Sequence, residues 1–370
     1  MGDLGTTFTG LSGKTAIDFG HGEASFITYM NVFTNPVSNP KMVEHVEIDS
    51  KQREVEVGDV FFTTSSETPE EVGMSSVLKE KSGVMYLNSF CFGFRPLVKF
   101  DLDYLAFMLR SESVRKQIKL LAQGISRFNI SKTKMMDIEI PLSKIDEQVA
   151  IGRYFAQLDN LITLHQRKYD SLVNVKKAML EKMFPKNGET VPEIRFKGFT
   201  DAWEQRKLGE VATEMIAGGD VDKELLLEEG HYPVIANALT NDGIVGYYND
   251  QYRIKAPAVT VTGRGDVGHA KARNVDFTPV VRLLSIKTNH DVYFLENAIN
   301  TLKIVIESTG VPQLTVPQLA KYEISFPKAL KEEEKIGQYF ANLDHLITLH
   351  QRKLEKLKNI KKSCLEKMFV

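Results

Sequence analysis

The octapeptide LITLHQRK occurs twice in the chain, at residues 161–168 and again at residues 346–353. The match extends on both sides of it: the 34 residues from Ile151 and the 34 residues from Ile336 share 24 identical positions without a gap. Chance does not produce identity over such a length, so the chain contains an internal duplication. This repeat limits the possible architectures before any single motif is considered.

Both copies of the repeat have the pattern of a long amphipathic helix. Apolar side chains recur every seven residues, and lysine, arginine and glutamine occupy the opposite face. Each helix is expected to run for roughly 35–40 residues, or about 50–60 Å at 1.5 Å per residue. A helix with one apolar stripe needs a partner, so the two copies are expected to pair with each other. The residues predicted to form this pairing are Leu158, Leu161, Ile162, His165, Leu172, Leu343, Leu346, Ile347, His350 and Leu357.

The histidines of the two helices, His165 and His350, occupy equivalent positions near the midpoints. In an antiparallel pair they should approach one another. A metal site formed by both is conceivable, but no third ligand is evident. A hydrogen-bonded histidine that fixes the register is therefore the favoured interpretation.

A globular part precedes each helix. Residues 124–141 and 310–327 each begin with glycine, continue through a short apolar-polar alternation and end as a strand at proline. Farther upstream, residues 55–66 and 254–265 are similar strand-and-loop segments. The initial MGDLG aligns with Gly209-Glu210-Val211, so the first globular part is expected to begin inside the repeat. The predicted class is α+β. The predicted boundaries are 1–143 and 207–328 for the globular parts, 144–185 and 329–370 for the helices, and 186–206 for a linker.

The composition is that of an ordinary soluble protein, with 42% hydrophobic and 26% charged residues. No apolar run is long enough to span a bilayer and no signal peptide opens the chain, so no membrane association is expected. The two cysteines, Cys91 and Cys364, are expected to be free thiols in a reducing cytoplasm. A net charge of −1 argues neither for nor against nucleic acid, because an uneven distribution can still produce a basic face.

Motifs of catalysis are missing from the sequence. The segment GRGDVG (263–268) matches a dinucleotide-binding pattern, but the residues after it look extended, whereas such a site needs a helix there. A tight glycine loop that presents Arg264 and backbone amides to an anion is favoured instead. No triphosphate loop, metal-ligand spacing, nucleophile elbow or amino-methyltransferase motif is visible. The sequence therefore predicts no catalytic residue, no metal and no bound cofactor.

Basic residues concentrate in both globular parts, where they could hold DNA phosphates or read base edges. The first cluster comprises Arg110, Arg115, Lys116, Lys119, Arg127, Lys132 and Lys134, and the second Arg253, Lys255, Arg264, His269, Lys271, Arg273 and Arg282. Most such charges are ordinary solvated surface, but Arg127 and Arg264 each lie in a loop beside a glycine. With the polar loops among them, the DNA-binding candidates are Thr63, Thr64, Ser65, Arg127, Asn237, Thr240, Arg264, Lys271 and Arg282.

This layout resembles the DNA-specificity subunit of a Type I restriction–modification enzyme. The resemblance covers nearly the whole chain and rests on IGRYFAQLDNLITLHQRK, IGQYFANLDHLITLHQRK, the strands ending at Pro141 and Pro327, and WEQRKLGEV. It implies two target recognition domains that each read half of a split sequence in double-stranded DNA. It also implies a pseudo-twofold repeat in which the two long helices form an antiparallel coiled coil that sets the unread gap.

The resemblance further implies partners. Two methylation subunits would dock on the chain, motor-nuclease restriction subunits would join them, and S-adenosylmethionine and ATP would bind in those partners. Two alternatives stay open: an interaction scaffold that does not read DNA, and an enzyme with an active site between the two repeats. A sequence-dependent, salt-sensitive shift of duplex DNA would discriminate among the three.

Overall fold

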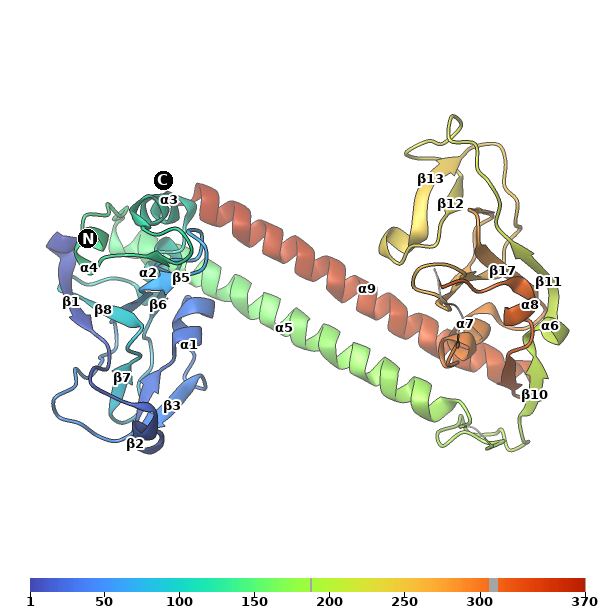
Figure 1. Cartoon of the computed structure of the whole chain (residues 1–370), viewed down its shortest axis with the longest axis horizontal. Helices are drawn as coiled ribbons and strands as arrows, with labels where there is room; N and C mark the ends of the chain where they lie inside the picture. The colour runs from blue at the N-terminus through green and yellow to red at the C-terminus, as the bar shows by residue number, and fades with distance from the viewer. Residues whose placement is uncertain (187, 306–311, 370) are drawn as a thin grey trace. The chain divides into compact units, whose positions relative to one another are not determined.

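The computed structural model describes residues 1–186, 188–305 and 312–369, so Gly310 and Val311 of the predicted segment 310–327 and the terminal Val370 lie outside the described residues. The chain divides into two compact units by its contacts. Unit 1 consists of residues 1–166 and 352–370, and unit 2 of residues 167–351. Each long helix therefore contributes one half to each unit, and each unit is an α+β structure with its own hydrophobic core (Figure 1).

Unit 1 is built on a four-stranded antiparallel sheet, whose strand order is β1 (Gly5–Thr9), β8 (Cys91–Pro96), β4 (Val60–Thr63) and β6 (Ser75–Val77). A second sheet has β2 (Phe19–Ile27) antiparallel to β3 (Val43–Val46) and parallel to β7 (Met85–Leu87). A short ladder joins β5 (Ser65–Ser66) to β9 (Phe128–Asn129).

Unit 2 repeats both larger sheets with the same strand order and directions. Its four-stranded antiparallel sheet runs β11 (Ala212–Ala217), β17 (Leu283–Thr288), β14 (Ala258–Thr262), β15 (Ala270–Arg273). Its second sheet has β12 (Tyr232–Ile235) antiparallel to β13 (Ile244–Tyr248) and parallel to β16 (Thr278–Pro279). A further pair, β10 (Glu204–Lys207) with β18 (Glu323–Phe326), belongs to this unit. The predicted repeat therefore includes the globular parts.

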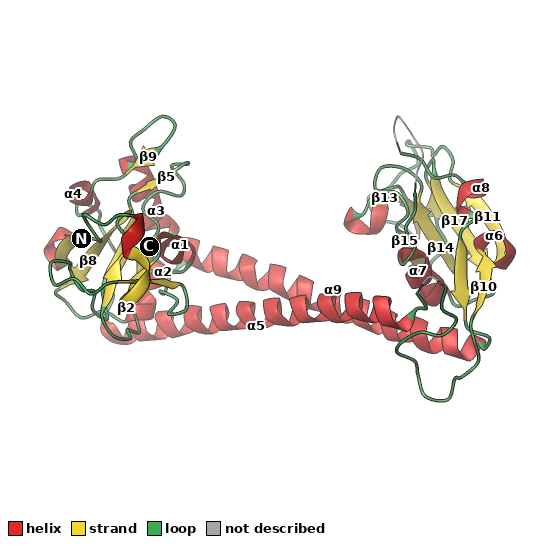
Figure 2. Ribbon diagram, turned by 60° about the horizontal axis from the view of Figure 1, so that its bottom comes forward, coloured by secondary structure: helices red, strands yellow, loops and turns green. Residues whose placement is uncertain are grey.

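Short helices complete each unit. Unit 1 contains α1 (Tyr29–Thr34), α2 (Leu102–Met108), α3 (Glu112–Leu121), α4 (Lys132–Met135) and the 3₁₀ turns η1 (Gly2–Leu4) and η2 (Ala16–Asp18). Unit 2 contains α6 (Leu208–Val211), α7 (Val292–Asn300), α8 (Val316–Leu319) and the 3₁₀ turn η3 (Thr240–Gly243). Helix α7 packs on β14 and β15, as Figure 2 shows, and α2 packs on β6.

The long helices are α5 (Ile145–Met183) and α9 (Leu330–Lys367). In unit 1, Lys361 Nζ lies 2.5 Å from Asp159 Oδ1, and in unit 2, Lys176 Nζ lies 2.6 Å from Asp344 Oδ1. These four residues occupy equivalent positions of the repeat. Ring contacts join Phe155 to Phe369 in unit 1 and Phe184 to Phe340 in unit 2. Together with the ion pairs, they show that in each unit the residue numbers of the first helical segment rise as those of its partner fall. The predicted antiparallel pairing is confirmed.

The side chains predicted for this pairing differ in burial. Leu158, Leu172 and Leu343 are buried, and Ile162, His165, Ile347, His350 and Leu357 are partly buried. Leu161 and Leu346, however, are 45% and 40% exposed, so assigning them to the buried seam was wrong. Each precedes by one position the residue that faces the partner helix, which places it on the edge of the stripe. The expected approach of His165 to His350 involves one residue from each unit and stays a prediction.

Each unit docks a long helix through a glycine. A Cβ on Gly152 would lie 2.3 Å from Asp101 Oδ1, and a Cβ on Gly337 would lie 2.0 Å from Asp291 Oδ1. Those two aspartates cap α2 and α7, accepting hydrogen bonds from the third residue of each helix. The glycines thus let the long helix approach the capped end of a short helix in the same way in both units.

Candidate nucleic-acid interface

Three of the four candidates of unit 1, which are Thr63, Thr64 and Ser65, follow one another from the end of β4 to the start of β5. Thr63 is fully buried, and its hydroxyl oxygen accepts the Met74 N–H at 3.0 Å. Its assignment as a DNA-contacting residue is therefore wrong: β4 is covered on both faces, so every residue of this strand is buried. Thr64 is partly exposed, and its hydroxyl donates to the Phe90 carbonyl at 2.9 Å. It holds a turn in place.

Ser65 and Arg127 come together although they are distant in sequence. The ladder between β5 and β9 places Ser65 opposite Asn129, two residues after the exposed Arg127. Both line a surface pocket of about 340 Å³ whose other walls are Tyr29, Met30, Phe33, Ser66, Glu67, Glu71 and Phe90. The Tyr29 hydroxyl donates to the Ser65 carbonyl at 2.7 Å, and burial raises the pKa of this tyrosine. The aromatic residues of this pocket carried no recognisable sequence signal.

Two other arginines of the first basic cluster lie inside unit 1. The Arg110 guanidinium donates to the carbonyls of Ser75 and Val32, both at 2.8 Å. The Arg115 guanidinium donates to three carbonyls, which are those of Glu70, Val72 and Gly73. Burial lowers the pKa of Arg110 to about 9 and that of Arg115 to about 10. These arginines stabilise loops and are not available to phosphates.

The five candidates of unit 2 lie on connected loops and one adjoining strand. Asn237 joins the loops: its Oδ1 accepts the Gly263 N–H at 2.8 Å, and its Nδ2 donates to the Val281 carbonyl at 3.0 Å. The loop after β12, the loop after β14 and the turn before β17 are thereby held together. Arg264 and Arg282 directly follow the two residues that Asn237 bonds.

The remaining candidates surround this junction. Thr240 is exposed on η3, where Asn241 and Asp242 have φ values of 50° and 52°. Lys271 is exposed on β15, with its Nζ 4.0 Å from Asp242 Oδ1. Arg264 is exposed and Arg282 partly exposed, and within the described part of unit 2 neither guanidinium has a hydrogen-bond or ion-pair partner. Two unpaired cations on one junction favour a polyanion as the ligand.

The glycine loop at residues 263–268 joins the antiparallel strands β14 and β15. No helix follows the glycines, which excludes the dinucleotide geometry. Gly265 and Gly268 have φ values of 75° and 92°, as a tight turn requires. The amides of Gly268 and His269 donate to Thr262. The expectation that the loop presents backbone amides to an anion therefore fails for these two amides, and its exposed cation is Arg264.

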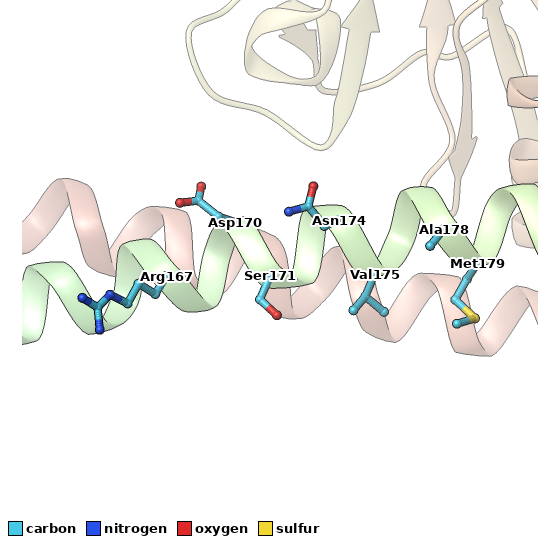
Figure 3. Close-up of a pocket in the computed structure, with 7 residues that line it drawn as sticks. All are labelled: Arg167, Asp170, Ser171, Asn174, Val175, Ala178 and Met179. Atoms are coloured by element: carbon cyan, nitrogen blue, oxygen red, sulfur yellow. The ribbon is translucent and has the colours of Figure 1, made fainter. Parts of the chain in front are cut away.

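The long helices offer a second kind of surface. A shallow groove of about 580 Å³ on α5 is lined by Arg167, Asp170, Ser171, Asn174, Val175, Ala178 and Met179. In Figure 3, Asp170 and Asn174 lie along one edge of the helix, while Val175 and Met179 lie along the other. Large apolar side chains are exposed elsewhere on both helices, including Leu164 (62%) and its equivalent Leu349 (38%).

The described residues contain no group of three or more histidine, cysteine, aspartate or glutamate side chains that could hold a metal ion. Among the same residues, no helix combines the length and the apolar character needed to cross a membrane. Cys91 and Cys364 are both free thiols. Burial raises the pKa of Cys91 to about 12, which leaves this thiol protonated at neutral pH.

Solved structures with a similar fold are specificity subunits or their assemblies. The S subunit of a Type I restriction–modification system from M. genitalium matches 100% of this chain and 94% of its own, with a TM-score of 0.68 and 14% identity. A chain from a Type I system, whose structure describes complex assembly and conformational transition, matches 92% of this chain and 90% of its own, with a TM-score of 0.50 and 16% identity. At these identities the matches establish the fold.

Curated relatives are named as specificity subunits. A putative subunit of Mycoplasma pneumoniae is 28% identical over 35% of this chain and 36% of its own length, and a second from that organism is 27% identical over 38% and 43%. The chain thus spans about two fifths of these relatives. A putative specificity subunit of a restriction enzyme from Methanocaldococcus jannaschii is 23% identical over 84% of this chain and 77% of its own length.

The family model described as the Type I restriction modification DNA specificity domain matches this chain twice, over residues 2–174 and 200–359. Each match contains one of the globular parts and most of the long helix that follows it. The chain therefore belongs to the family of Type I restriction–modification DNA specificity subunits.

Proposed function

We propose that this chain is the sequence-specific DNA-binding subunit of a Type I restriction–modification enzyme, with each globular part reading one half of a bipartite target. The observation that carries the proposal is the repeated scaffold with different loops. The two units share strand order and helix docking, yet their exposed polar loops differ. A duplicated scaffold with diverged loops suits two-part recognition, because each half-site meets the same frame with different side chains.

The paired helices would set the unread gap and carry the methylation subunits. Leu161 and Leu164 on α5 are exposed, and so are their equivalents Leu346 and Leu349 on α9. Exposed leucines retained in both copies suit a repeated protein contact better than solvent. Two equivalent surfaces would accommodate two methylation subunits, to which motor-nuclease restriction subunits would add.

The chemistry would lie in the partners. Specificity subunits of Type I systems are generally non-catalytic. Methylation would use S-adenosylmethionine in the methylation subunits, and cleavage would use ATP in the motor-nuclease subunits. The chain itself would supply recognition and spacing.

The proposal is tested by titrating the chain with its methylation subunits against duplex DNA of random and of methylated-site sequence at several salt concentrations. Tight binding to one bipartite sequence, with affinity falling steeply as salt rises, is expected. Binding without sequence preference would indicate the interaction scaffold instead. Catalytic turnover by the chain alone would indicate the enzyme between the repeats.

A further inference from the structure

Both polar atoms of the Asn237 side chain make hydrogen bonds within unit 2. Its oxygen accepts the Gly263 N–H at 2.8 Å, and its amide nitrogen donates to the Val281 carbonyl at 3.0 Å. An asparagine that reads adenine needs both of these groups for the base edge. A bidentate base contact would compete with these two hydrogen bonds, so they favour a positioning role for Asn237, although its residue type and loop position made it a candidate for reading bases.

The backbone around Asn237 is closely fitted. A Cβ on Gly263 would lie 2.2 Å from the Arg282 carbonyl oxygen, so the two loops touch at this point. Arg282 has a φ of 70°, a left-handed conformation that arginine rarely adopts. The Val280 N–H also donates to the Ile235 carbonyl at 2.8 Å, which ties the turn to β12. Such a conformation persists only where the surrounding contacts determine it.

These contacts act on the two residues whose guanidinium groups have no partner among the described residues of unit 2. Arg264 follows Gly263 and Arg282 follows Val281, so each arginine is one residue away from a hydrogen bond to Asn237. The β14–β17 ladder, in which Thr262 pairs with Leu283, ends beside these residues, and Asn237 adds a side-chain link between the two loops just beyond it. Arginine donates to both O6 and N7 of guanine in the major groove, which is the commonest base-specific contact of proteins.

We propose that Asn237 is a positioning residue that couples Arg264 and Arg282, so that unit 2 reads guanine edges in its half-site through both arginines together. This inference rests on the proposed function and adds the bases that unit 2 recognises and a residue that holds the two reading loops in place. The other half-site lies outside its reach, because no side chain of this junction belongs to unit 1.

The experiment uses the chain assembled with its methylation subunits. Binding is competed with duplexes in which each base pair of the target is varied in turn. Arg264→Ala and Arg282→Ala should each reduce the preference for a guanine by about 10-fold to 100-fold, at different positions of one half-site. Asn237→Ala should reduce the preference at both positions at once and leave the other half-site unchanged.

A second substitution separates the two hydrogen bonds. Asn237→Asp keeps an acceptor for the Gly263 N–H but loses the donor to the Val281 carbonyl. It should therefore lower the preference at the Arg282 position and retain it at the Arg264 position. Asn300→Ala is the matched control, because Asn300 also bonds one N–H and one carbonyl, both of Ala270, and contacts neither arginine loop. The control should leave base preferences unchanged.

Several results would overturn the inference. These are an unchanged base preference in Asn237→Ala, an equal loss of affinity for every duplex, and arginine variants that alter no base preference. If Asn237→Ala unfolds unit 2, the position-specific result of Asn237→Asp decides. A wild-type complex without any base preference would contradict the proposed function itself. If the wild-type complex prefers particular bases and the Asn237 variants keep the same preference, only the role of Asn237 is rejected.

Discussion

Units 1 and 2 place particular arginines of their basic clusters differently on the same scaffold. In unit 1, Arg110 and Arg115 point into the protein and donate to backbone carbonyls. In unit 2, Arg264 and Arg282 lie on connected loops, and neither side chain has a hydrogen-bond or ion-pair partner among the residues that the structure describes. Arginines from basic clusters that look alike in the sequence therefore have different roles, since some bind backbone carbonyls and others lie on exposed loops. The loops that carry Arg264 and Arg282 differ from their counterparts in unit 1, whereas the sheets and helix docking are shared.

The shared docking tolerates a change of chemistry. The Asp101 N–H donates to Gln148 Oε1 in unit 1, and the Asp291 N–H donates to Glu333 Oε2 in unit 2. A Glu333 carboxylate oxygen also lies 3.0 Å from His290 Nδ1. Unit 1 has no equivalent contact, because Phe100 occupies the position that corresponds to His290. The position of the long helix is thus maintained by equivalent geometry even where the side chains differ.

The comparison predicts first that the helices set the gap for both units. Duplicating residues 159–165 in α5 and the equivalent 344–350 in α9 adds about 10 Å of helix. The apolar stripe stays nearly in phase, with a drift of about 20°. The unread gap should grow by about three base pairs while both half-sites stay the same. Methylation mapping measures the gap once gel filtration has shown intact assembly. Methylation at the original spacing would show that the helices do not set it.

The next largest effect concerns the buried arginine of unit 1. Arg115→Ala leaves three backbone carbonyls without their donor and should destabilise unit 1 by about 3 kcal/mol. Arg127→Ala, which removes an exposed arginine of the same unit, should change stability by less than about 0.5 kcal/mol. Hydrogen exchange of β4 and β8 under denaturant reports unit 1 separately from unit 2. Equal stability of both variants would mean that Arg115 is not a structural anchor.

The helix-docking glycines give a smaller and symmetrical effect. Gly152→Ala and Gly337→Ala each force a methyl group against a capping aspartate and should cost about 2 kcal/mol in their own unit. The exposed neighbours provide controls, since Arg153→Ala and Gln338→Ala add no atoms at the contact. Unequal losses in the two units, measured by exchange in α2 and α7, would contradict equivalent docking.

The smallest effect concerns the equivalent ion pairs between the helices. Each pair is about a quarter exposed, so Lys176→Ala and Lys361→Ala should each cost about 0.5 kcal/mol. Double-mutant cycles with Asp344→Ala and Asp159→Ala isolate the pairwise energies. The two coupling energies should agree within about 0.3 kcal/mol. If only one pair shows coupling, the two ion pairs are not energetically equivalent.

The sequence predicted the repeat and the paired helices because a period of seven and 24 identities are visible without any structure. It placed Leu161 and Leu346 in the seam wrongly, since adjacent apolar positions cannot be told apart when both flank the stripe. It favoured Arg264 over Arg115 because a glycine lies beside Arg264, but it could not show that Arg115 is buried against backbone carbonyls. Both are basic residues in globular parts, and only the fold decides which one meets carbonyl groups.

The most direct test of the central claim is to map methylated bases on DNA. The DNA is treated with the methylation subunits and either the wild-type chain or the Arg264→Ala chain. The account predicts a target in two halves with an unread gap. It also predicts that the substitution weakens recognition of one half by about 1–3 kcal/mol and leaves the other half unchanged. A continuous target, or a substitution that alters both halves, would contradict two units that read separate half-sites on a shared scaffold.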